Sequence, residues 1–104
     1  MDFVRSKNNI PIRLTDERWQ HISTGHPEMA DFYFEILETI QEPSIIYEGN
    51  YGELIAVGFQ NKLSDIFFVV VYKEVNLVDG FVITAYLSNK KQSFKKKKIL
   101  WKHQ

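Results

Sequence analysis

Two histidines in the first third of the chain lie among residues whose types fit acid–base chemistry. His21 and His26 are five positions apart, Arg13 lies upstream of them, and Glu28 follows the second. Histidine changes its charge near neutral pH, so an imidazole can take or give a proton there. An arginine can hold a phosphate with two parallel hydrogen bonds, which makes Arg13 a candidate phosphate ligand.

Two hydroxyl groups occur much later, at Thr84 and Tyr86, in an apolar stretch that alternates like a strand. Imidazoles, an arginine and hydroxyls together are the groups needed to cleave RNA without a metal. A base removes the ribose 2′ proton, an acid protonates the leaving 5′ oxygen, and donors stabilise the charge on phosphorus. Such a reaction leaves a 2′,3′-cyclic phosphate.

Each of these residues also has a structural explanation, and the sequence leaves both readings open. His21 can form hydrogen bonds beside a core, and His26 can cap a following helix. Thr84 and Tyr86 are strong strand formers. Arg13 can be solvated or paired with a nearby carboxylate at position 16 or 17.

Metal binding is not expected from this composition. The chain has no cysteine, which excludes thiolate ligands and disulfides. His21 and His26 are separated by Gly25, unlike the two histidines of a His-Glu-x-x-His motif on one helix face. Glu28 fits the positive start of a helix and needs no catalytic explanation. We expect no cofactor.

The net charge of zero hides two halves of opposite sign. Residues 1–60 carry 4 Lys/Arg and 10 Asp/Glu, whereas residues 61–104 carry 9 and 3. Lys90, Lys91 and the run 95–98 can offer a polyanion a cationic surface, with Lys90 and Lys91 as candidate substrate ligands. The alternative is a solvated tail that only aids solubility.

The pattern along the chain predicts helices first and strands afterwards. An alternating strand is expected at 10–14, followed by a helix capped by Thr15 and a second helix from Pro27 to about Pro43. Four strands follow, at 44–48, 53–60, 65–73 and 81–88, with turns at 49–52, 61–64 and 76–80. In the last strand, Val82, Thr84 and Tyr86 are expected to share one side. Residues 94–101 are compatible with a strand, a short helix or a tail.

This order predicts an α+β fold with two N-terminal helices packed on one face of a curved antiparallel sheet of four to five strands. With 104 residues we expect one domain over residues 1–88 and a lysine-rich extension over residues 89–104. The chain has no secretory signal pattern and no apolar run near the ~20 residues of a membrane helix. A cytoplasmic protein is therefore expected.

Three segments resemble the phage-type members of the Barnase–EndoU–colicin–RelE nuclease superfamily: "RLTDERWQHI…GHPEM", "ILETIQEPSIIYEG" and "GFVITAYLS". The resemblance covers residues 10–88. It implies a small helix-plus-sheet fold and metal-independent RNA cleavage in a toxin or phage setting. By motif it assigns catalysis to His21, His26 and Thr84, while Gly25 replaces the family's usual basic residue before the His-Pro pair.

Two functions follow as expectations, besides an enzyme of unrelated chemistry on the same scaffold. The first is a small endoribonuclease that binds RNA through its basic half and is neutralised by an acidic antitoxin or immunity protein. The second is a non-catalytic nucleic-acid- or protein-binding module of the same fold, in which the histidines are structural. The sequence does not specify the oligomeric state.

Overall fold

A seven-stranded mixed sheet and two α-helices make up the part of the chain that the computed structural model describes, residues 1–59 and 65–104. The elements in chain order are β1 (Asp2–Arg5), β2 (Pro11–Leu14), α1 (Asp16–Gly25), the 3₁₀ helix η1 (Pro27–Met29), α2 (Tyr33–Gln41), β3 (Ile45–Glu48), β4 (Leu54–Phe59), β5 (Phe67–Asn76), β6 (Asp79–Ser88), the 3₁₀ helix η2 (Lys91–Phe94) and β7 (Ile99–Lys102).

The strand order across the sheet is β1-β2-β6-β5-β4-β3-β7. Strands β3 to β6 form an antiparallel meander, as the short connections predict. The β1–β2 hairpin joins this meander beside β6, where β2 pairs with β6 in parallel. At the opposite edge, β7 pairs with β3 in antiparallel orientation.

The predicted fold class is therefore wrong in three respects. The sheet has seven strands instead of four or five, it is mixed because β2 and β6 run in parallel, and two strands precede the helices where only the one at 10–14 was predicted. Strand β1 was not predicted, and a strand was one of three alternatives left open for the segment that contains β7; both are four residues long and lie at the two edges. Each depends on pairing with a partner strand, and this pairing is not encoded in a local pattern.

Local signals placed the first helix correctly. The Thr15 hydroxyl accepts a hydrogen bond from the backbone N–H of Arg18, so the predicted N-cap is confirmed. The predicted second helix is interrupted: η1 ends at Met29, and α2 begins only at Tyr33. The whole region still turns its apolar side chains, such as Met29 and Ile36, into the core.

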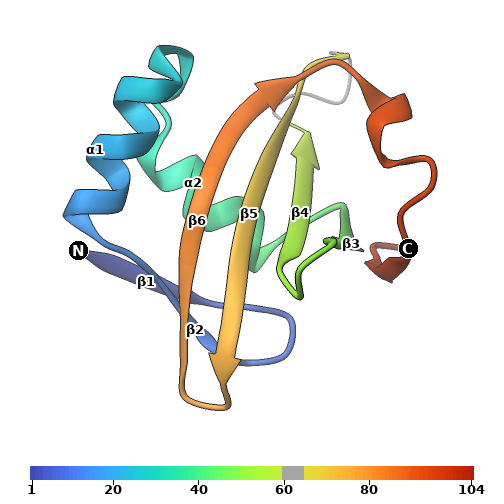
Figure 1. The fold of residues 1–104 in the computed structure, drawn as a ribbon, viewed down its shortest axis with the longest axis horizontal. Helices are drawn as coiled ribbons and strands as arrows, with labels where there is room; N and C mark the ends of the chain where they lie inside the picture. Colours follow the sequence, from blue (N-terminus) through green and yellow to red (C-terminus); the bar gives the residue numbers. More distant parts are fainter. Residues whose placement is uncertain (60–64) are drawn as a thin grey trace.

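The two faces of the sheet are covered differently (Figure 1). Helix α2 packs on one face against β1, β4 and β5, while α1 and η1 pack beside β6. This helix-side core includes Ile22, Leu37, Phe68 and Tyr72. On the other face lies a smaller cluster of Ile55, Val57, Phe67, Val69 and Phe94, which we call the open-face cluster.

A register shift in β6 changes the predicted distribution of its side chains. Val71 of β5 pairs with Thr84, but the next residue, Tyr72, pairs with Val82, so Ile83 is an extra residue in the ladder. The prediction that Val82 shares a side with Thr84 and Tyr86 is wrong, because Val82 is buried in the helix-side core. Thr84 and Tyr86 remain together on the other side.

Residues 89–104 cross the open face and end at the far edge of the sheet. Among the alternatives for this segment, the structure has both a short helix, η2, and a strand, β7. Phe94 is 6% exposed and stacks on Tyr47 of β3. The predicted end of the third strand at 60 and the turn at 61–64 lie outside the described residues. Neither described helix has the length and apolar content to span a bilayer.

Candidate active site

His26 lies at the junction of α1 and η1, the two helical elements that pack beside β6. Its backbone N–H donates to the carbonyl of Ile22, which closes α1, and Pro27 begins η1 directly afterwards. The imidazole lies against the phenol ring of Tyr86, with 5.6 Å between ring centroids and 31° between ring planes. One sequence-predicted catalytic residue is thus placed next to a predicted substrate ligand.

The structure of β6 explains why His26 can reach Tyr86. Described pairing between β2 and β6 is confined to Ile12 with Gly80 and Arg13 with Phe81. Beyond that point, β6 has β5 on one side and the α1–η1 junction on the other. The imidazole therefore lies beside a part of β6 that has no described strand pairing on that side.

Thr84 and Tyr86 present their side chains on the same side of β6. They pair with Val71 and Val69 of β5 in continuous register, so their side chains are two residues, or about 7 Å, apart along the strand. Both are partly buried. Burial raises the pKa of the Tyr86 phenol, so that it stays protonated and can donate a hydrogen bond at neutral pH.

Glu28 also lies close to the histidine ring. Its Oε2 is 3.6 Å from Nδ1 of His26, and the two side chains are 42% and 40% exposed. The carboxylate faces Nδ1 of the ring, so Nε2 is left for proton transfer. Sequence reasoning attributed Glu28 to the helix start alone; the spacing His-Pro-Glu is the signal that could have identified this pair. We call His26, Glu28, Thr84 and Tyr86 the His26–Tyr86 cluster.

His21 lies elsewhere on α1. It is exposed and lines a shallow depression of about 320 Å³ with Glu17, Gln20 and Thr24. It lies five positions before His26, and at 3.6 residues per turn this spacing turns the two side chains to different sides. Among the described contacts, none joins His21 to the His26–Tyr86 cluster, so the structure does not bring the two predicted catalytic imidazoles together.

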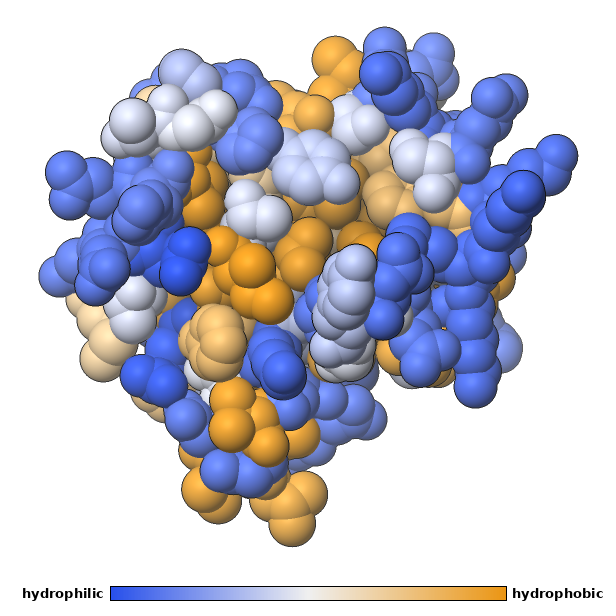
Figure 2. All heavy atoms as spheres, in the orientation of Figure 1, coloured by the Kyte–Doolittle hydropathy of each residue, from blue (hydrophilic) through white to orange (hydrophobic). Residues whose placement is uncertain are grey.

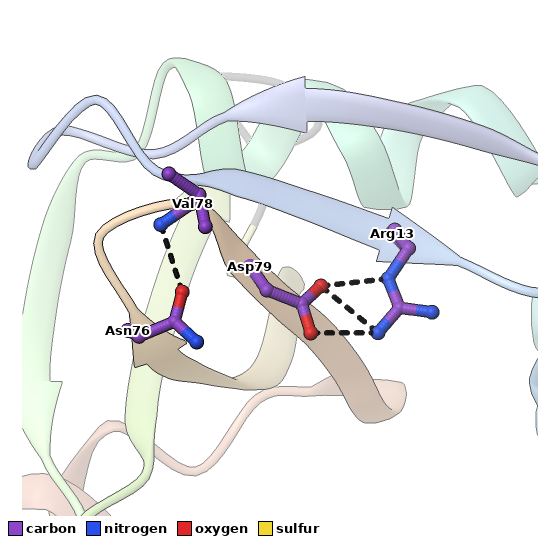
Figure 3. A network of polar contacts seen from close by, with 4 residues as sticks. All are labelled: Arg13, Asn76, Val78 and Asp79. Carbon is purple, nitrogen blue, oxygen red and sulfur yellow. Dashed lines mark hydrogen bonds and ion pairs between the residues drawn. The ribbon is translucent and has the colours of Figure 1, made fainter.

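The guanidinium of Arg13 forms an ion pair with Asp79 (Figure 3). Its Nε and Nη2 donate to Oδ1 and Oδ2 of Asp79 at 2.9 and 3.1 Å, a two-pronged contact between β2 and the start of β6. The sequence offered Asp16 or Glu17 as partners because they are close along the chain. The actual partner is 66 positions away, and only the parallel β2–β6 pairing brings it near.

Lys90 and Lys91 follow the end of β6 and are both exposed. They line a wide depression of about 690 Å³ together with Asp65, Asn89, Gln92 and Ser93. The Lys91 Nζ also lies 5.6 Å from the centre of the Phe59 ring. The basic segment thus begins just after the strand that carries Thr84 and Tyr86.

The open face has an apolar centre (Figure 2). In that view, apolar side chains gather over the central strands between polar side chains of α1 and of the C-terminal segment. The described residues contain no group of three side chains suited to hold a metal ion. The arrangement offers one imidazole–carboxylate pair, two hydroxyl donors and a lysine-rich border.

No protein-family model, curated protein or solved structure matches this chain. The resemblance to the Barnase–EndoU–colicin–RelE superfamily therefore stays a prediction from the quoted motifs.

Proposed function

We propose that the protein is a metal-independent endoribonuclease of toxin or phage type, which cleaves RNA at the His26–Tyr86 cluster. The observation that carries this proposal is the contact between His26 and Tyr86, backed by the Glu28 carboxylate. A ring that is 40% exposed can meet a substrate, and a partly buried phenol can donate a directed hydrogen bond.

The reaction uses a single imidazole. His26 takes the proton from the ribose 2′ hydroxyl, and Glu28 stabilises the imidazolium that results. The 2′ oxygen attacks phosphorus while Tyr86 and Thr84 donate hydrogen bonds to the phosphoryl oxygens. The bond to the 5′ oxygen breaks, and that oxygen leaves as a hydroxyl after taking a proton from water. The hydroxide so formed is neutralised by the proton that the His26 imidazolium releases, which regenerates the base. The products are a 2′,3′-cyclic phosphate and a 5′-hydroxyl end.

The lysines of residues 89–104 supply the long-range attraction for the substrate. They are concentrated beside the open face, whereas residues 1–60 are acidic. Neutralising phosphates with lysines releases counterions and makes binding weaken as salt rises. An acidic antitoxin would compete for the same lysines, which is the partner expected from charge complementarity.

The test is incubation of the purified protein with total RNA in the presence of a chelator. We expect cleavage with 5′-hydroxyl and cyclic-phosphate ends. The His26→Ala variant should lose about 10²–10⁴-fold in rate, the usual contribution of a general base. The matched control is His21→Ala, which removes an imidazole from the same helical region and should stay within about twofold of the unchanged protein.

Three outcomes would contradict the proposal: undiminished cleavage by His26→Ala, cleavage that requires a metal ion, or RNA binding without any cleavage. The last outcome would favour the non-catalytic binding module instead.

A further inference from the structure

A cleft of about 370 Å³ lies between the C-terminal segment and the open face of the sheet. Its floor comes from β3, β4 and β5, and its rim comes from η2 and the end of β7. The lining residues are Ser44, Ile45, Tyr47, Val57, Phe59, Phe67, Lys91, Phe94, Lys102 and His103. This aromatic cleft is separate from the His26–Tyr86 cluster, and the mechanism above does not use it.

The aromatic rings in the cleft differ in how far they are exposed to solvent. Phe94 is buried between Tyr47 and Phe67, with 5.0 Å and 11° to the Tyr47 ring. Its ring faces are therefore occupied by protein. Phe59 is 43% exposed at the mouth of the cleft and meets Phe67 at 5.8 Å with 66° between the ring planes. Lys91 lies over the Phe59 ring, so the ring becomes a flat apolar surface for a ligand when Lys91 moves away.

Basic side chains border this surface. Lys91 lies 5.6 Å from the Phe59 ring centre, and Lys102 and His103 line the other side of the cleft. The described lining residues include no carboxylate. A flat apolar surface bordered by ammonium groups matches a planar ring that carries a phosphate, which is the chemistry of a nucleotide. An acidic peptide would satisfy the lysines but would leave the aromatic surface without a planar partner.

We propose that the aromatic cleft binds one nucleotide of a single-stranded RNA, with the base on Phe59 and its phosphate held by Lys91 and Lys102. Lys91 leaves the Phe59 ring when the base arrives and pairs with the phosphate instead. The choice of RNA as the ligand rests on the proposed function, whereas the cleft and its cations do not.

The cleft is within reach of the His26–Tyr86 cluster along one row of the sheet. Tyr86 pairs with Val69, Val69 pairs with Val57, and Val57 lines the cleft. Neighbouring strands are about 4.8 Å apart, so this row separates the backbones of Tyr86 and Val57 by about 10 Å. A short oligonucleotide can therefore occupy both places, and the cleft would favour cleavage at a fixed distance from the bound base.

The experiment measures binding separately from cleavage. A fluorescent 2′-O-methyl RNA oligonucleotide lacks the attacking hydroxyl, so it can bind but cannot be cut. We expect Phe59→Leu to weaken its binding about tenfold, because it removes one stacking surface, and Phe59→Trp to retain the binding. Lys102→Gln should lower the slope of log K against log salt by about 0.7, the loss of one phosphate contact.

Matched controls are Phe34→Leu, an exposed ring on α2, and Lys96→Gln, an exposed residue of the same lysine-rich segment. Phe34→Leu should leave binding unchanged, and Lys96→Gln should lower the salt slope less than Lys102→Gln. Circular dichroism of each variant shows whether it is folded. A nucleoside monophosphate and an oligoglutamate peptide serve as further probes.

The proposal is overturned if folded Phe59→Leu and Phe59→Trp bind the oligonucleotide equally, or if oligoglutamate binds as tightly as RNA. The two proposals fail in different ways. If RNA binding depends on Phe59 but ordinary RNA is not cleaved, the proposed nuclease function is refuted and the proposed nucleotide binding in the cleft stands. Cleavage that depends on His26 but is unchanged in the Phe59 variants would refute only the proposal that the cleft binds a nucleotide.

Discussion

The phenol of Tyr72 is buried in the helix-side core, and its hydroxyl has no hydrogen-bond partner among the described residues. A buried hydroxyl without a partner costs about 1–3 kcal/mol of desolvation. We expect Tyr72→Phe to raise the free energy of unfolding by about 1 kcal/mol, measured by urea denaturation. Tyr51→Phe, at an exposed site, is the control and should change nothing; a destabilised Tyr72→Phe would contradict this account.

The same residue affects stability at alkaline pH. Burial, and to a lesser degree the charge of Glu74, raises the pKa of Tyr72 in the folded protein. Above about pH 10 the unfolded chain loses this proton first, so the free energy of unfolding falls as pH rises. Tyr72→Phe should flatten this decline. Part of it should remain, because burial and a hydrogen bond to Asp2 raise the pKa of Tyr33 to about 12.

Composition and short spacing named the candidate site residues by their chemical types but did not identify the partners of those residues. His26 and Tyr86 were both singled out from the sequence, and they touch. Their contact joins residues 60 positions apart and depends on where β2 stops pairing with β6, which no local pattern encodes. The partner of Arg13 was missed for the same reason, since Asp79 is distant in sequence.

At the scale of elements, the parallel contact between β2 and β6 leaves no room beside Gly80. A Cβ atom there would lie 2.5 Å from Cδ1 of Ile12 and 2.6 Å from the carbonyl oxygen of Lys73. We expect Gly80→Ala to lower the free energy of unfolding by about 2 kcal/mol, because a backbone atom cannot yield as a flexible side chain does.

The matched control for that prediction is Gly25→Ala, at the end of α1, where a Cβ atom meets nothing within 4 Å. Its denaturation midpoint should stay the same or rise slightly, since alanine favours helix. Equal effects of the two substitutions would show that the β2–β6 contact is looser than described here.

Elements marked by a local sequence pattern, such as a helix cap or an apolar run, were predictable. Features that depend on which strands pair were not. Helix α1 carries its own cap at Thr15, and β5 is marked by its apolar run. The parallel arrangement of β2 and β6 follows instead from the hairpin that β1 completes, which is a property of the assembled sheet. The extra residue Ile83 in β6 likewise depends on β5 and changes the side on which Val82 lies.

At the scale of the whole molecule, packing of the Phe94 ring holds residues 89–98 against the open face. Its ring contacts Tyr47 and Phe67, and it is the buried residue of η2. We expect Phe94→Ala to lower the free energy of unfolding by about 3 kcal/mol, the usual cost of a buried Phe→Ala cavity. Hydrogen exchange should also become faster in η2 and β7 than in β5.

The control for Phe94→Ala is Phe34→Ala, at a ring that is 69% exposed on α2. It should cost much less stability and leave exchange in β7 unchanged. If both variants accelerated exchange throughout the sheet to the same degree, Phe94 would have no special part in holding the C-terminal segment.

One amine connects regions that are far apart in the chain. Lys7, in the β1–β2 turn, lies 3.6 Å from Oε2 of Glu42 just past α2 and 4.9 Å from the ring centre of Trp101 on β7. Acetylation of this amine would abolish the ion pair and weaken the attraction to the indole in a single event. A modifying enzyme would thus remove the Lys7 contacts of the N-terminal hairpin with Glu42 and Trp101 while every hydrogen bond between paired strands stays intact.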